Sequence, residues 1–592
     1  MPNGGVALGP SDEISRPSSP AKLVPSNNGS DAALIQPPTI KDEISSSAAA
    51  VSDDEAAPSP KPEITYLHGT RFYLLTLVLW ICIFFANIES SIVSTSLVTI
   101  TNGFNGFSQA DWIVSAYQIT YTCFLVIWAK IGDIFGRKRA LLGALVLFAV
   151  FSGGCGAAQT MNQLIILRSF QGLGASGAFS VSSVMLYEMV PKEKLPMYGA
   201  LAFTIVALAT VIGPLMGGAI DNNTTWRWIF LINVPSLVVA IILAYIVMPA
   251  NFPHHGKPVS LELNSRPMNP PSPSPFFSLA KKIDVIGAVF LLAGAFLLLT
   301  ALLEASVNFR WSSATIITLL VISGVAWIAF FAWEWYLSRS SLAQEPIFSW
   351  RFVQNPIWMG MLVSAFCLGV PMATLSIILP QRFQAVNGDS PLEAGIHFLP
   401  LTIALPVGSF VGNIIFAVLP KVPPSVFLLA GSAVELIGAG LLITLPSSAS
   451  DSLPHSLYGF QILTGFGAGI VFSILMMVTP RCVEVRDLAT ASSCIVMFRM
   501  IGGAIGVAVS GSVVNGRITA SAISSALSPD QVHRLLEDIS QISTLSPAQQ
   551  VIVRTALAQA FHTCLIFVAV LACVQLVSMC SIWRLPSAAK TK

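Results

Sequence analysis

The stretch that decides the fold is Ala-Lys-Ile-Gly-Asp-Ile-Phe-Gly-Arg-Lys-Arg at residues 129–139. It is a short basic turn between two uncharged apolar runs, 112–128 and 140–158. Each run is long enough to cross a bilayer as a helix, which takes about 20 apolar residues. Lys and Arg collect in the short cytoplasmic loops of membrane proteins. The stretch therefore predicts a hairpin of two membrane helices with its turn in the cytoplasm.

Composition also favours a membrane protein. Of the 592 residues, 54% are hydrophobic and only 10% are charged, and the mean hydropathy is +0.74. A soluble protein carries about 25% charged residues. The net charge of +2 offers no strongly basic surface, so we expect no nucleic-acid partner.

No pattern typical of an enzyme occurs in the sequence. It has no metal-ligand spacing, no phosphate-binding loop and no nucleophile elbow. We therefore expect no catalytic residue, no metal, no cofactor and no enzyme activity. All nine cysteines lie within or at the edge of apolar runs, which is typical of small core residues and not of a disulfide framework.

Apolar runs long enough to cross the roughly 30 Å hydrocarbon core of a bilayer occur fourteen times. They begin near Phe72, Trp112, Ala140, Leu164, Leu201, Trp228, Val285, Ala314, Ile357, Ala394, Val426, Leu457, Ala489 and His562. Lys and Arg concentrate in alternate connections, which places the N-terminus in the cytoplasm. The sequence thus predicts an all-α membrane protein with both ends of the chain in the cytoplasm.

A faint internal repeat divides these spans. Gln-Gly-Leu-Gly-Ala at 171–175 is echoed by Thr-Gly-Phe-Gly-Ala at 464–468, so the fourth span matches the twelfth. Duplicated halves are typical of secondary transporters, whose substrate sites lie between the halves near mid-membrane. The predicted parts are a disordered cytoplasmic tail at 1–66, a six-helix half at 67–250, a cytoplasmic loop at 251–282, two inserted helices at 283–338, a second six-helix half at 339–585 that includes an external loop at 516–560, and a cytoplasmic tail at 586–592.

Two external features add detail to this topology. Within the loop, Ser-Pro-Asp-Gln at 528–531 and Ser-Pro-Ala-Gln at 546–549 have the pattern of helix starts, and a surface helix is predicted behind the first. Overlapping N-glycosylation sequons begin at Asn222 and Asn223 in another external loop. Their closeness to the membrane disfavours their use.

At the basic turn the chain resembles the major facilitator superfamily, and specifically its fourteen-span drug:proton antiporters. The resemblance covers about 70–585 and implies the major facilitator fold with fourteen transmembrane helices, similar to fungal toxin and multidrug exporters. Residues 133–139 match the family loop between the second and third spans, although Ala129 and Ile134 depart from its usual pattern. In the family this loop latches the cytoplasmic gate. That role falls on Asp133, Gly136, Arg137, Lys138 and Arg139; the alternative is a positive cluster that only sets topology.

A second resemblance lies in the fifth span. Ile-Gly-Pro-Leu-Met-Gly-Gly at 212–218 resembles the family's antiporter motif, which favours export over import, although Ala209 stands where the motif has Gly. The motif residues are Gly213, Pro214, Gly217 and Gly218. Glycines give a smooth helix face for close approach of another helix, and simple packing of small residues is the alternative explanation.

Charged residues inside spans are costly and usually functional. Arg168 lies in 167–172, which resembles the fourth-span motif where the family ties Arg to proton transfer. Glu89 replaces the usual Asp of the first-span signature, and we expect it to carry protons in concert with Arg168. The alternatives are that Glu89 hydrogen-bonds Ser91 or Ser94 and that Arg168 extends to the external interface. Gln171, Glu435 and Arg499 are candidate cavity residues, as relays, substrate contacts or structural partners.

The sequence therefore predicts a proton-coupled exporter of hydrophobic or amphipathic small molecules that works by alternating access. The expected cargo is a fungal secondary metabolite or toxin, with drugs as incidental substrates, and the expected partners are that small molecule, protons and the lipid bilayer. A monomer in the plasma membrane is expected, with the vacuolar membrane as second choice. Siderophore transport and vacuolar basic-amino-acid transport remain alternatives within the superfamily. A transporter-like receptor is a further alternative, for which a large cytoplasmic signalling domain is expected.

Overall fold

The structure of the protein is a computed structural model. It describes residues 69–104, 110–191, 194–249, 252, 283–305, 309, 311–340, 344–419, 421–446, 453–484, 487–518, 527–528, 531–532, 542 and 544–580. The predicted tails at 1–66 and 586–592 lie outside the described residues, as does nearly all of the loop at 251–282. Most of the predicted surface helix behind Ser528 also lies outside them.

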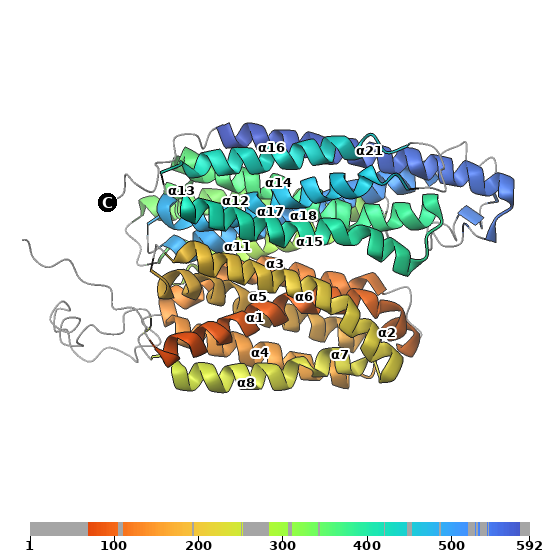
Figure 1. The fold of residues 1–592 in the computed structure, drawn as a ribbon. Coiled ribbons are helices and arrows are strands. Elements are labelled where there is room, and N and C mark those ends of the chain that lie inside the picture. The colour runs from red at the N-terminus through yellow and green to blue at the C-terminus, as the bar shows by residue number, and fades with distance from the viewer. Residues whose placement is uncertain are drawn as a thin grey trace, which may run out of the picture. The chain divides into compact units, whose positions relative to one another are not determined.

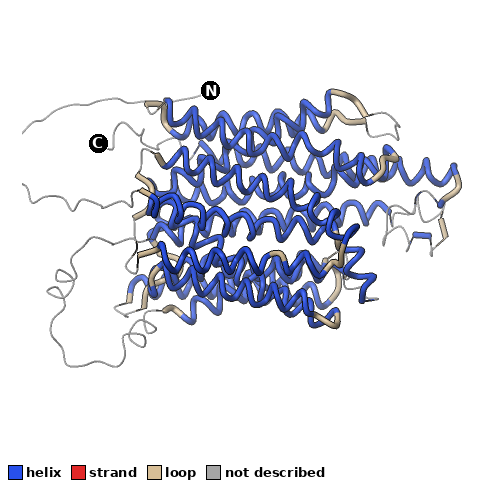
Figure 2. The backbone as a smooth tube through the Cα atoms, turned by 60° about the horizontal axis from the view of Figure 1, so that its bottom comes forward, coloured by secondary structure: helices blue, strands red, loops and turns tan. Residues whose placement is uncertain are grey.

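Helices make up almost all of the described chain (Figures 1 and 2). Their bounds are α1 Thr70–Thr95, α2 Leu97–Phe104, α3 Ala110–Phe135, α4 Arg137–Ala157, α5 Met161–Met189, α6 Leu195–Asn223, α7 Arg227–Leu231, α8 Asn233–Val247, α11 Val285–Glu304, α12 Ala314–Arg339, α13 Arg351–Gln354, α14 Pro356–Arg382, the π-helix η2 Phe383–Asn387, α15 Pro391–Val418, α16 Pro424–Leu442, α17 Ser456–Cys482, α18 Leu488–Ile518 and α21 Pro547–Cys580.

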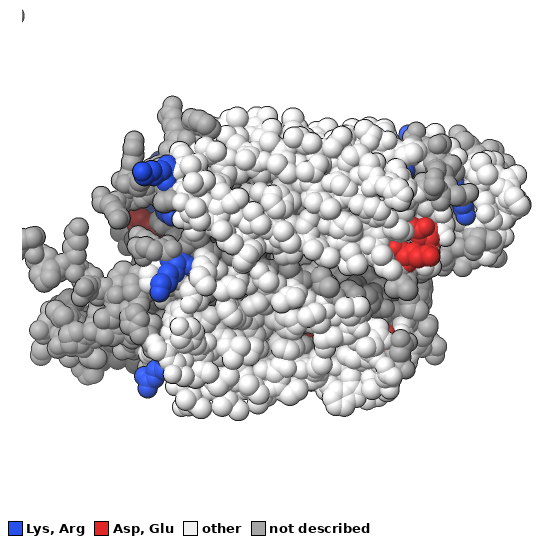
Figure 3. Space-filling view, viewed as in Figure 1, with Lys and Arg blue, Asp and Glu red and all other residues white. Residues whose placement is uncertain are grey.

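Fourteen helices in the described residues are long and apolar enough to cross a membrane, which confirms the predicted fold class. Their lengths follow from the uncharged runs seen in the sequence, since about 20 apolar residues in a helix match the hydrocarbon thickness. In Figure 3, uncharged atoms cover the broad middle of the visible face, and the coloured charged side chains lie toward its two ends. This distribution suits a surface that lipid surrounds.

The helices on either side of the inserted pair form two sets. Helix α1 packs on α5, α6 and α8, and α3 and α4 pack on α5. In the later chain, α14 packs on α18 and α21, and α17 packs on α15 and α16. In Figure 1 the red-to-yellow helices lie together below the green-to-blue helices. Contacts of α3 with α18 and of α6 with α15 join the two sets, while α11 touches α12, α3 and α18.

The helix start predicted at 546–549 is confirmed, and the external position of 516–560 stays a prediction. Helix α18 continues to Ile518, and α21 begins at Pro547, directly after Ser546, whose backbone N–H donates to Gln549 Oε1 at 3.2 Å. With 34 residues, α21 is about 50 Å long, well beyond the hydrocarbon thickness. Its first turns are held by Val553, Leu557 and Phe561, which pack in one buried cluster with Ile518 and Leu545. Polar residues interrupt the hydrophobic run before His562, which is why hydropathy alone predicts the last span to begin there.

Candidate functional site

A buried ion pair lies inside the first helix set. Glu89 of α1 and Arg168 of α5 are both 0% exposed, and Arg168 Nη1 donates to Glu89 Oε1 at 2.5 Å. The second carboxylate oxygen of Glu89 accepts from Asn233 Nδ2 of α8, also at 2.5 Å. Helices that are far apart in the sequence thus bring a cation and an amide to one carboxylate, which offsets part of the cost of burying the charges.

The remaining contacts of Arg168 fix its guanidinium in place. Nε donates to the carbonyl of Ile113 at 3.0 Å, and Nη1 also donates to Gln171 Oε1 at 2.8 Å. The guanidinium carbon lies 4.4 Å from the ring centre of Tyr117, within range of a cation–π contact. Because Arg168 is fully buried, it does not extend to the external interface, and that alternative is wrong.

Gln171 belongs to this same cluster. Its Nε2 donates to Ser152 Oγ of α4 at 2.8 Å, so the polar chain runs from Asn233 through Glu89 and Arg168 to Ser152. Sequence reasoning missed Asn233 and Ser152, although Asn233 is a polar residue in an otherwise apolar run. Ser91, a predicted alternative partner of Glu89, donates to the carbonyls of Ile88 and Ala209. The side chain of Ser94 lies outside the described residues.

The basic turn contains a second buried ion cluster. Gly136 has φ +93°, a backbone conformation that favours glycine, and it starts α4 directly after α3 ends. Arg137 Nη2 lies 2.6 Å from Asp133 Oδ1 and 2.7 Å from Glu188 Oε1 of α5. Arg137 Nε also contacts both carboxylate oxygens of Glu188 at 3.1 Å. The turn is thereby tied to α5 through Glu188, which the sequence reasoning missed.

The other two basic residues of the turn behave differently from Arg137. Lys138 donates to the carbonyls of Tyr245 at 2.8 Å and Met248 at 2.6 Å, at the end of α8. The C-terminal end of a helix carries partial negative charge on its free carbonyls, so this contact is electrostatically favourable. Arg139 is exposed, as expected of a residue that marks the cytoplasmic side.

The glycines of the antiporter motif are not equivalent. A Cβ atom built on Gly213 would lie 2.0 Å from Ser91 Oγ, so α6 approaches α1 closely at this position. The same atom built on Gly218 would meet nothing within 4 Å. Gly217 is buried, and the side chain of Pro214 lies outside what the structure describes. The close approach predicted for the motif is therefore present at Gly213.

Glu435 and Arg499 lie in the second helix set and do not join the Glu89 cluster. Glu435 of α16 is fully buried and accepts from Gln575 Nε2 of α21 at 2.7 Å. The guanidinium carbon of Arg499 lies 4.6 Å from the ring centre of Phe472, and Arg499 Nε has no hydrogen-bond partner among the described residues. Of the three candidate cavity residues, only Gln171 contacts the Glu89–Arg168 pair.

The sequon residues lie at the end of α6. Asn223 is exposed, and its side-chain amide donates to the carbonyl of Ala219 at 2.8 Å. The side chain of Asn222 lies outside the described residues. The site is accessible at Asn223, but its use stays a prediction.

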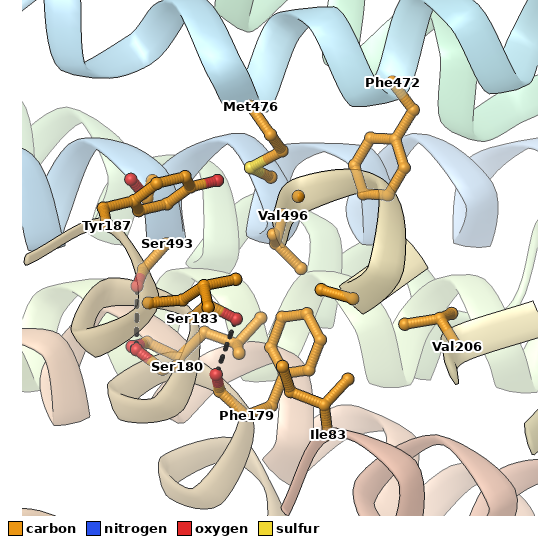
Figure 4. Close-up of a pocket in the computed structure, with 15 residues that line it drawn as sticks. Ile83, Phe179, Ser180, Ser183, Tyr187, Val206, Phe472, Met476, Ser493 and Val496 are labelled. Atoms are coloured by element: carbon orange, nitrogen blue, oxygen red, sulfur yellow. Dashed lines mark hydrogen bonds between the residues drawn. The ribbon is translucent and has the colours of Figure 1, made fainter. Parts of the chain in front are cut away.

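A cavity opens between the two helix sets, lined mainly by apolar side chains (Figure 4). Its empty space is about 610 Å³, open solvent included. Ile83 and Phe179 line it from one set, and Phe472, Met476 and Val496 line it from the other. None of its lining residues carries a charge. An apolar cavity with a few hydroxyls suits a small hydrophobic molecule.

A serine pair joins the two sets at the edge of this cavity. Ser180 of α5 and Ser493 of α18 place their hydroxyl oxygens 2.8 Å apart (Figure 4). Ser180 also donates to the carbonyl of Leu125 in α3. The cavity therefore lies at the interface between the two helix sets.

Comparisons with known proteins agree with this architecture. The chain is 38% identical over 501 residues to the MFS-type transporter FPY5 of Fusarium mangiferae, covering 84% of this chain and 81% of that protein. It is 30% identical over 459 residues to the efflux pump bfoC of Aspergillus brasiliensis, covering 77% of each chain. Among solved structures, the human organic anion transporter MFSD10 (TETRAN) matches with a TM-score of 0.51 at 13% identity, over 85% of this chain and all of that one, which supports the fold alone.

The family assignment rests on both sequence and fold. Residues 79–354 match the family described as the Major Facilitator Superfamily. The relatives from Fusarium and Aspergillus are matched over more than two thirds of their own lengths. This chain is a multi-pass membrane transporter that belongs to the major facilitator superfamily.

Proposed function

We propose that this transporter exports a hydrophobic or amphipathic small molecule, most simply a fungal secondary metabolite or toxin, in exchange for protons. The observation that carries the proposal is the uncharged cavity between the two helix sets. Its aromatic, methionine and valine side chains remove apolar surface of a ligand from water, which stabilises binding by roughly 25 cal/mol per Å². The names of relatives, among them efflux pump bfoC, support export as the direction.

The same cavity argues against the two rival cargoes. A basic amino acid carries a cation that needs a carboxylate nearby, and a siderophore presents many polar oxygens. The residues that line the cavity are apolar or hydroxyl-bearing, with Ser183 and Ser492 among the few polar ones. A buried charge without a partner costs several kcal/mol, so a charged cargo is disfavoured here.

Proton coupling is assigned to Glu89 and Arg168. When Glu89 is ionised, its attraction to Arg168 and the amide of Asn233 holds α1, α5 and α8 together. A proton on Glu89 removes that attraction and leaves Arg168 with neutral acceptors on Ile113 and Gln171. The two protonation states therefore favour different packing of the first helix set, which is the requirement for coupling a proton to alternating access.

We assign the movement to the two helix sets, each of which is expected to move largely as a body. The turn with Asp133 and Arg137 is fastened to α5 by Glu188, so the cytoplasmic ends of α3, α4 and α5 are expected to move as one body. Within the first helix set, α1 and α6 approach each other closely at Gly213. We propose a monomer in the plasma membrane, with the vacuolar membrane as second choice.

The decisive experiment uses the source organism with and without the gene. We expect a metabolite to disappear from the medium and to accumulate inside the cells that lack the gene. The unmodified chain should restore export, whereas the Glu89→Gln variant should not. Unchanged export together with reduced uptake of iron chelates would overturn the proposal and favour siderophore transport.

A further inference from the structure

Two carboxylates are buried close together where the inserted helices α11 and α12 meet. Asp284, the residue before α11, and Glu334 of α12 are each 0% exposed. A Cβ atom built on Gly287 would lie 2.1 Å from Asp284 Oδ2 and 3.0 Å from Glu334 Oε1, so both carboxylates face the same point. The absence of a side chain at Gly287 leaves room for them.

Each carboxylate has one oxygen held by donors and one without a partner. Asp284 Oδ1 accepts from the backbone N–H of Gly287 and from Trp333 Nε1, each at 2.8 Å. Glu334 Oε1 accepts from the backbone N–H of Phe348 at 3.1 Å. Asp284 Oδ2 and Glu334 Oε2 are buried and have no hydrogen-bond partner among the described residues. Buried polar atoms without partners are rare, so each one calls for an explanation.

The charged and titratable groups around the pair come from three other elements. Lys130 of α3 attracts Glu334 electrostatically and lies 3.4 Å from Glu345 of segment 344–348, which therefore neutralises much of its charge. From α18, the Cys494 thiol faces Glu334, and Asp487, just before α18, also lies within reach of Lys130. One partly neutralised cation is too little to balance two buried carboxylates.

We propose that Asp284 and Glu334 together hold one proton, forming a proton-binding site on the inserted helices that is separate from Glu89. Two carboxylates that face each other away from water cannot both stay ionised, and a shared proton relieves the repulsion. The charge rests on Asp284, whose Oδ1 accepts from Gly287 and Trp333 at 2.8 Å, and the proton rests on Glu334, whose hydrogen bond from Phe348 is longer, at 3.1 Å. A metal ion does not fit, because the described residues offer no group of three metal-binding side chains.

The site is connected to the contact between α3 and segment 344–348. Glu334 holds Phe348 of that segment, and Ile283, next to Asp284, forms a backbone bridge with Glu345. Glu345 in turn pairs with Lys130 of α3. Loss of the shared proton therefore leaves two like charges that repel each other next to segment 344–348. This repulsion weakens the contact between that segment and α3.

Infrared spectroscopy of the full-length protein in lipid nanodiscs tests the proton directly. We expect the unmodified protein at neutral pH to show a C=O band of a protonated carboxylic acid that Glu334→Gln removes. Asp284→Asn takes away the neighbouring charge, so the band should then vanish at a less alkaline pH. Glu304→Gln, the same change at a buried acid at the other end of α11, should keep the band. A band that Glu334→Gln leaves intact would overturn the proposal.

Hydrogen exchange of the same full-length samples tests the connection to segment 344–348. Exchange rates are first corrected for the intrinsic pH dependence of amide exchange. Protection of the Phe348 amide should then fall when the pH rises past the point at which the infrared C=O band disappears. In Glu334→Gln that fall should be absent, and in Glu304→Gln it should persist. Equal pH dependence in the unmodified protein and in Glu334→Gln would contradict the connection. If Glu334→Gln does not fold, Asp284→Asn is used in its place to measure the pH dependence of both the infrared band and the Phe348 protection.

Discussion

Arg168 and Glu89 meet at 2.5 Å with neither side chain exposed, and they belong to helices that are far apart in sequence. The pair has the amide of Asn233 on one side and that of Gln171 on the other. A buried pair of this kind contributes little net stability, yet removal of one partner costs about 3–5 kcal/mol because the other charge is left unmatched. We therefore expect protonation of Glu89 to change the packing of the helices that meet at this pair.

The first prediction concerns Glu89→Gln. The variant should lose pH-driven export almost completely, by at least about tenfold, while it still binds a neutral substrate, since the cavity lies among other side chains. Glu89→Asp should keep part of the activity because it retains a carboxylate. The measurement is accumulation of the exported compound in inside-out vesicles under an imposed pH gradient, with Glu304→Gln as the matched control. Vesicles of Glu89→Gln that still concentrate the compound would rule Glu89 out as the essential carrier.

The second prediction separates gating from topology at the basic turn. Asp133→Asn should lower transport about tenfold, a change of about 1.4 kcal/mol, and leave expression and insertion near normal because the basic residues stay. Glu188→Gln should lower transport further, since Glu188 receives both Nε and Nη2 of Arg137. The measurement is the transport rate of each variant, divided by the amount of that variant in the membrane. Normal transport by both variants would mean that the turn is a topology signal only.

The fold could be predicted from sequence because membrane helices are specified by local composition. Runs of uncharged apolar residues and the Lys and Arg of the loops identified fourteen spans. Hydropathy alone places the start of the last span near His562, whereas α21 begins at Pro547, at the predicted helix start, and buried contacts of Val553 and Phe561 with neighbouring segments support its first part. Hydropathy carries no information about such contacts.

Single residues of the candidate site were predictable where their chemistry is unusual for a membrane. Glu89 and Arg168 stand out as charges inside apolar runs. Asn233, which contacts Glu89, and Glu188, which pairs with Arg137, come from other helices, and only the packing of those helices brings them close. The Asp284–Glu334 pair could not be predicted for the same reason. Trp333, the residue before Glu334, contacts Asp284 across 49 positions of the chain.

The third prediction tests the close approach of α1 and α6. Gly213→Ala should reduce transport about tenfold or more, because its Cβ would lie 2.0 Å from Ser91 Oγ and 3.1 Å from the backbone nitrogen of Ile92. Gly218→Ala should have a much smaller effect, because nothing lies within 4 Å of its Cβ. Adding Ser91→Gly to Gly213→Ala should restore part of the activity. Export assays on the four proteins check this, and equal effects at both glycines would contradict the packing explanation.

The last prediction concerns a substitution that places a large side chain in the cavity. Val496→Trp places a large ring among Phe472, Met476 and Phe179, so export should fall at least about tenfold while the protein still inserts and folds. Added volume in a packed core typically costs about 1–3 kcal/mol, but an open cavity can accept part of the new ring. The matched control is Val321→Trp on α12, where the valine is 60% exposed and the ring would face lipid. Thermal unfolding and export are measured for both variants. Loss of export in Val496→Trp at an unchanged unfolding temperature identifies the cavity as the substrate path, whereas full export by Val496→Trp would place the substrate elsewhere.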